Sequence, residues 1–98
     1  MTELRNRRIL FVDDEPRLLE AIERKLAGQF EITTVTSGAK GLEALAGAQL
    51  PFAVIVSDMR MPGMDGAAFL AQARTLARTS TRLLLTGDTS LKLSLIHI

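Results

Sequence analysis

Short apolar runs alternate along this chain with longer segments in which apolar residues recur every three or four positions. Runs of this length that are rich in β-branched residues are typical of buried strands in a parallel sheet. The longer segments have the spacing of helices with one buried face. The alternation predicts an α/β fold, a parallel sheet wrapped by helices through right-handed crossovers. We expect strands at residues 9–13, 31–35, 52–57 and 82–86, and helices at residues 16–27, 38–46 and 66–78.

Local signals mark the ends of the predicted helices. Pro16 suits the first turn of a helix, where its missing N–H is not needed. Ser37 and Asp65 precede the second and third helices, and their side-chain oxygens can cap them. Gly28 is expected to close the first helix. The proline and glycines within residues 59–66 predict an irregular loop before the third helix.

Composition narrows the class of protein. With 98 residues, 47% hydrophobic and 23% charged, the chain has the make-up of a single globular domain. A net charge of +1 argues against nucleic acid or a membrane surface as a direct partner. The chain has no cysteine, which excludes disulfides and thiolate chemistry. No apolar stretch approaches the ~20 residues of a membrane span, and we expect a cytoplasmic location.

Two of the predicted strands end on carboxylates. Asp13 and Asp14 follow the first strand, and Asp58 follows the third. In open α/β sheets the ligand site lies at the carboxyl ends of the strands, so these acids would share one edge if the strands are neighbours. Crowded carboxylates favour a hard cation such as Mg²⁺, and an aspartate can attack a phosphoryl group to form an acyl phosphate. Taken singly, each acid is as well explained as a helix cap or a solvated side chain.

A hydroxyl group closes the fourth predicted strand. Thr86 could donate a hydrogen bond to a phosphoryl oxygen held near the acids. It could equally be a β-branched strand residue with an incidental hydroxyl.

Three motifs, in this order and at these separations, resemble the receiver domain of bacterial two-component response regulators. They are VDDEP at residues 12–16, SDMRMPGMDG at residues 57–66 and LTG at residues 85–87. The resemblance covers residues 8–90. It implies a flavodoxin-like, doubly wound sheet with strand order 2-1-3-4-5, in which the first and third strands lie side by side as the carboxylate argument requires.

The resemblance also implies a role for each site residue. Asp58 corresponds to the phosphoacceptor and Asp14 to the direct Mg²⁺ ligand, with Asp13 assisting through bound water. The backbone carbonyl of Arg60 corresponds to a further metal ligand, and Thr86 to the hydroxyl residue that follows the phosphate. The phosphoryl group would come from a histidine kinase or a phosphotransfer protein, and the sequence does not name the output domain. Such a domain is a signalling module and not an enzyme, and any self-phosphorylation or dephosphorylation is autocatalytic.

The chain departs from the family pattern after the fourth strand. The family has a lysine at the end of strand five, about twenty residues after the position of Thr86, and no lysine of this chain matches it. We therefore expect a truncated receiver over residues 1–93, with strand order 2-1-3-4 and with strand five and the last helices missing. Residues 94–98 would form an atypical, non-native tail. Strand four would then be an exposed sheet edge that favours self-association, and phosphorylation would be impaired.

Two other readings of the chain remain open. One is an inactive or non-phosphorylated docking fragment, which would keep partner binding without Mg²⁺ affinity. The other is a small phosphohydrolase with an aspartate nucleophile. Those enzymes carry a second acid two residues after the nucleophile, where this chain has Arg60. Turnover of a phosphomonoester would identify the second reading.

Overall fold

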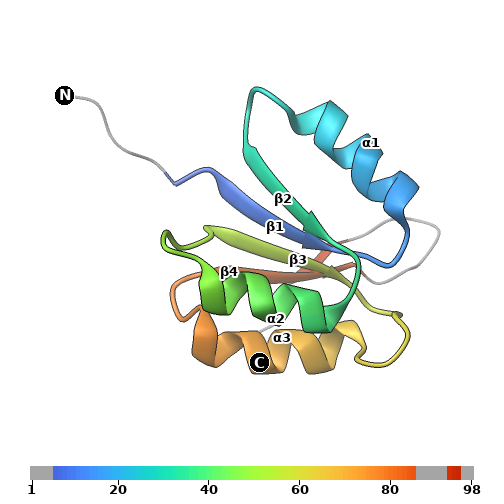
Figure 1. Ribbon diagram of the computed structural model, residues 1–98, viewed down its shortest axis with the longest axis vertical. Coiled ribbons are helices and arrows are strands. Elements are labelled where there is room, and N and C mark those ends of the chain that lie inside the picture. The colour runs from blue at the N-terminus through green and yellow to red at the C-terminus, as the bar shows by residue number, and fades with distance from the viewer. Residues whose placement is uncertain (1–5, 86–92, 96–98) are drawn as a thin grey trace.

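A five-stranded sheet forms the centre of the computed structural model, which describes residues 6–85 and 93–95 (Figure 1). The strand order is β2-β1-β3-β4-β5. The first four strands are parallel, and β5 runs antiparallel to β4. The predicted order 2-1-3-4 is therefore confirmed. The strands are β1 (Arg8–Val12), β2 (Glu31–Val35), β3 (Val54–Asp58), β4 (Thr81–Leu85) and β5 (Leu93–Leu95).

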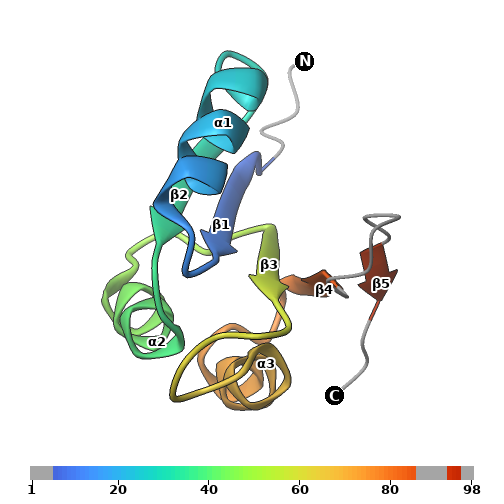
Figure 2. The ribbon, with the colours of Figure 1, turned by 90° about the vertical axis from the view of Figure 1, so that its right-hand side faces the viewer.

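Three helices connect the parallel strands and cover both faces of the sheet. They are α1 (Pro16–Leu26), α2 (Gly38–Gly47) and α3 (Gly66–Leu76). Figure 2 shows α2 and α3 together on one face, and α1 on the other face beside β1 and β2. This is the doubly wound arrangement that the sequence predicts. In the described part of the chain the longest helices have 11 residues, too few to cross a bilayer.

The predicted helix caps are present. The Ser37 hydroxyl accepts a hydrogen bond from the backbone N–H of Lys40 at 3.1 Å, and the Asp65 carboxylate accepts one from the N–H of Ala68 at 2.8 Å. Each cap satisfies a donor that the first helical turn leaves unpaired. Gly28 adopts a φ of 89°, in the left-handed region that favours glycine, and it reverses the chain after α1.

The core lies between the sheet and the α2–α3 layer. Alternate residues of β1 and β3 point into this layer, and Phe69 and Leu70 of α3 meet them. Helix α2 approaches α3 closely at Gly41, where a Cβ atom would lie 2.6 Å from the Phe69 ring. The fully buried apolar side chains of the described residues are Leu10, Val12, Ile55, Phe69, Leu70 and Ala73. This packing holds β1 and β3 against the α2–α3 layer.

The expectation that strand four forms an exposed edge is wrong. Strand β5 pairs with β4 through Leu83↔Leu95, Leu84↔Ser94 and Leu85↔Leu93. A strand of three residues is too short to give a periodic signal, and an antiparallel partner needs no crossover helix. Because β5 covers this edge of β4, the predicted self-association through an exposed β4 has no structural basis. The predicted domain boundary after residue 93 falls within β5 and stays a prediction.

Candidate functional site

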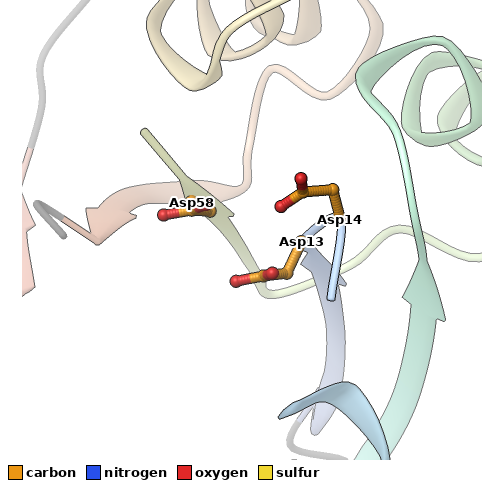
Figure 3. Close-up of side chains that lie close together, drawn as sticks. All are labelled: Asp13, Asp14 and Asp58. Atoms are coloured by element: carbon orange, nitrogen blue, oxygen red, sulfur yellow. The ribbon is translucent and has the colours of Figure 1, made fainter. Parts of the chain in front are cut away.

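Three aspartates meet at the carboxyl ends of β1 and β3. These strands are neighbours, and Val12 pairs with Ser57, so the residue that follows each of them lies at the same edge of the sheet. Asp13 and Asp14 leave β1, and Asp58 ends β3 (Figure 3). One carboxylate oxygen from each aspartate lies within 4.8 Å of the other two. The predicted convergence of these acids is confirmed.

The three acids differ in their exposure to solvent, and burial shifts the pKa of Asp13. Asp13 is 5% exposed, Asp58 is half-buried and Asp14 is exposed. Burial raises the pKa of Asp13 because water no longer solvates its charge, and the carboxylates of Asp58 and Asp14 add to the rise. The N–H of Glu15 donates to Asp13 Oδ1 at 2.9 Å, which opposes part of the rise in pKa. The net result is a pKa of Asp13 above its ordinary value.

The donor set suits a hard divalent cation. All three side chains offer carboxylate oxygen, and the group contains no histidine or cysteine. Oxygen-only sites with one to three carboxylates select Mg²⁺ or Ca²⁺ over softer metals. Within the ranges that the structure describes, no ion pair joins Lys or Arg to these acids. The residues present therefore fit Mg²⁺, and its charge would offset the repulsion among them.

Among the described residues, the carbonyls of Asp58 and Met59 accept hydrogen bonds, whereas the Arg60 carbonyl and several carbonyls after it in the same loop accept none. The Ser57 hydroxyl donates to the Asp58 carbonyl at 3.0 Å, and the Gly66 N–H donates to the Met59 carbonyl at 2.9 Å. Arg60 is the next residue, and no donor from the described residues bonds to its carbonyl oxygen. This agrees with the Arg60 carbonyl as an oxygen ligand, a role that stays a prediction.

Sequence reasoning missed the contribution of two neighbours of Asp58. Ser57 is a fully buried polar residue, and the only signal for it is a hydroxyl at the end of an apolar run. The sequence predicts Gly66 as the end of a loop and the first residue of the third helix, but it does not predict that Gly66 touches the Asp58 backbone. Thr86 lies outside the described residues, so its predicted contact is neither seen nor contradicted.

A family model described as the response regulator receiver domain matches residues 9–96 of this chain. The chain belongs to the response regulator receiver family. The resemblance seen in the three sequence motifs is thus confirmed, and the aspartate cluster fits the acidic pocket of a receiver domain.

Individual relatives are similar over most of the chain. The hydrogenase transcriptional regulatory protein HoxA of Cupriavidus necator is 36% identical over 81 residues, which are 83% of this chain and 16% of HoxA. A crystal structure titled adenylate cyclase from Rhodopirellula baltica has a TM-score of 0.83 and 44% identity, and covers 89% of this chain and 64% of that one. The chain spans a quarter or less of the length of the curated relatives it matches.

One solved relative is known in two complexes. The response regulator TrrA of Thermotoga maritima, in complex with Mg²⁺ and BeF, has a TM-score of 0.74 and 28% identity, and covers 86% of this chain and 72% of that one. TrrA is also solved with the histidine kinase ThkA, with a TM-score of 0.71 and 28% identity, covering 86% of this chain and 77% of that one. Receiver domains are signalling domains that bind Mg²⁺ at such an acidic cluster and are phosphorylated by histidine kinases.

Proposed function

We propose that Asp58 accepts a phosphoryl group from the phosphohistidine of a histidine kinase or a phosphotransfer protein. The observation that carries this proposal is the convergence of Asp13, Asp14 and Asp58 within 4.8 Å. Asp58 is half-buried, so its carboxylate is accessible to a donor and still fixed by the sheet. The TrrA–ThkA complex supports a histidine kinase as the partner.

The transfer needs an oxygen nucleophile and a leaving nitrogen. A carboxylate oxygen of Asp58 forms a bond to phosphorus while the bond between phosphorus and the imidazole nitrogen breaks, and the product is an acyl phosphate. The imidazole leaves with the electron pair of the broken bond and is protonated by solvent. Mg²⁺, when bound, would neutralise charge on the carboxylate and phosphoryl oxygens. We propose as its ligands Asp13, Asp14, Asp58 and the carbonyl of Arg60.

Thr86 is proposed as the residue that senses the phosphate. It directly follows Leu85, which pairs with Asp58 across β3 and β4. A threonine hydroxyl can donate to a phosphoryl oxygen, and its movement would bias the conformation of the adjoining surface.

Three further expectations accompany this function. We infer a cytoplasmic location and a signalling role without turnover of a substrate, and both await experiment. Impaired phosphorylation, predicted from the unmatched lysine, also stays a prediction. The reaction described next tests it, and an efficient gain of one phosphate on Asp58 would contradict it.

Intact-mass spectrometry tests the proposal directly. The chain is incubated with acetyl phosphate with and without Mg²⁺, and fragmentation then locates the phosphate. Because impaired phosphorylation is also predicted, we expect slow and partial labelling, with one phosphate on Asp58 that depends on Mg²⁺ and is absent from Asp58→Asn. Phosphate on another residue, or equal labelling of Asp58→Asn, would contradict the proposal.

A further inference from the structure

Asp58 is the last residue of β3, and it is paired with a neighbouring strand on only one side. Pairing between β1 and β3 ends at Val12↔Ser57, so Asp58 has no partner in β1. On the other side Asp58 pairs with Leu85 of β4, and the N–H of Met59 donates to the Leu85 carbonyl at 3.1 Å. The phosphoacceptor therefore lies at a point where the ladder holds it from one side only.

Gly66, the first residue of α3, contacts the backbone of Asp58 and Met59. Its N–H donates to the Met59 carbonyl at 2.9 Å. A Cβ atom on Gly66 would overlap the Asp58 carbonyl oxygen and lie 2.8 Å from Cδ1 of Leu84. Only a hydrogen atom fits between α3 and the Asp58 peptide, so any larger residue must move one of them.

Ser57 holds the same carbonyl group through its hydroxyl. The Ser57 side chain is fully buried and donates to the Asp58 carbonyl oxygen at 3.0 Å. Loss of this hydrogen bond would lower the stability of the fold, because a buried hydroxyl without a partner costs free energy. One carbonyl group is thus fixed by a hydrogen bond from Ser57 and by close contact with Gly66.

We propose that Ser57 and Gly66 are positioning residues for the phosphoacceptor. By fixing the plane of the Asp58–Met59 peptide, they set the direction of the Asp58 side chain and its distance from Asp13 and Asp14. The inference rests on the proposed function of Asp58. It goes beyond that function because it proposes that two residues that touch neither the phosphate nor the metal increase the rate of phosphoryl transfer.

Small errors in the position of a nucleophile have large effects on rate, and a misplacement of 1 Å can cost about 100-fold. We expect Gly66→Ala to slow phosphorylation by about 100-fold and Ser57→Ala by about tenfold. Affinity for Mg²⁺ should change much less, because two of its three carboxylates, Asp13 and Asp14, follow β1. A variant that is merely unfolded would lose both properties together.

The decisive comparison is between two substitutions of Ser57. Ser57→Ala removes the hydroxyl and adds no volume, whereas Ser57→Thr keeps the hydroxyl and adds a methyl group to a fully buried site. If the hydroxyl positions Asp58, the threonine variant is faster than the alanine variant. If only packing matters, the order is reversed, because overpacking is the greater disturbance. Gly47→Ala is the matched glycine control, since its Cβ would have no atom within 4 Å.

The experiment measures initial rates with acetyl phosphate by intact mass, and Mg²⁺ dissociation constants by NMR titration. Both are measured at a temperature where circular dichroism shows each variant folded. The proposal is supported if the rates fall in the order wild type, Ser57→Thr, Ser57→Ala while the Mg²⁺ constants stay within about threefold. It is overturned if Ser57→Ala matches the wild type or exceeds Ser57→Thr. If Gly66→Ala does not fold, the comparison of the phosphorylation rates of Ser57→Ala and Ser57→Thr tests the proposal on its own. A wild type without phosphate on Asp58 would sink the proposed function as well, which separates the two failures.

Discussion

Alanine at position 41 would test how tightly α2 packs on α3. A Cβ atom there would lie 2.6 Å from Cε1 and 2.9 Å from Cζ of Phe69. The Phe69 ring is fully buried, so it cannot swing into solvent to make room. Overpacking a core costs about 1–3 kcal/mol, and alanine in a helix interior gains about 1 kcal/mol over glycine. The sum predicts that Gly41→Ala lowers the free energy of unfolding by between about 0 and 2 kcal/mol.

A smaller residue at position 69 should reverse the sign of this effect. Phe69→Leu alone costs on the order of 1–2 kcal/mol, because it removes part of a buried ring. In that background the new methyl group of Gly41→Ala no longer meets the ring, so the helix gain of up to about 1 kcal/mol is recovered. The coupling between the two substitutions is then about 1–3 kcal/mol.

Urea unfolding followed by circular dichroism gives the four free energies of this double-mutant cycle. Gly47→Ala in both backgrounds is the control, because its Cβ would contact nothing within 4 Å. It should change stability equally with and without Phe69→Leu. If Gly41→Ala changes the free energy of unfolding equally in both backgrounds, contact with the Phe69 ring is not the cause of its effect on stability.

Two further predictions concern the acidic pocket. The pKa of Asp13 is raised above 3.8 in the folded protein, so the folded state binds its proton more tightly than the unfolded state does. The free energy of unfolding is measured in EDTA for the wild type and for Asp13→Asn. As pH rises from below 3.8 through the pKa of Asp13 in the folded state, the value for the wild type should fall relative to that for Asp13→Asn and then level off. Parallel pH profiles of the two proteins would refute this. Adding Mg²⁺ at 100 times its dissociation constant should raise the free energy of unfolding by about 2.7 kcal/mol. Thermal unfolding of Asp14→Asn at the same Mg²⁺ concentration should show a much smaller gain, and an equal gain would exclude Asp14 as a ligand.

The layout of the pocket could be predicted because its signals are local. Each of β1 and β3 is an apolar run that ends on an acid, and parallel strands bring their carboxyl ends together. The capping roles of Ser37 and Asp65 are equally local, since each side chain bonds to a backbone N–H three residues later. Local chemistry of this kind can be inferred from a single chain.

Other features depend on distances between segments that the sequence does not specify. The contact between Gly66 and the Asp58 carbonyl requires a known separation of α3 from β3. The pairing of β5 with β4 depends on how the chain returns to the sheet after Leu85, and three residues carry no period. The predicted third strand begins two residues early, at Phe52, because buried apolar character continues outside the ladder.

The register Val12↔Ser57 couples the core to the chemistry of the pocket. One residue inserted into β1 would move Asp13 by about 3.3 Å along the sheet and turn its side chain to the opposite face. The same insertion would expel Leu10 and Val12 from the buried layer, because side chains alternate along a strand. An insertion or deletion in either strand is therefore expected both to lower stability and to displace the carboxylates of the pocket. The length of each strand should vary less among functional descendants of this chain than the identity of its apolar side chains does.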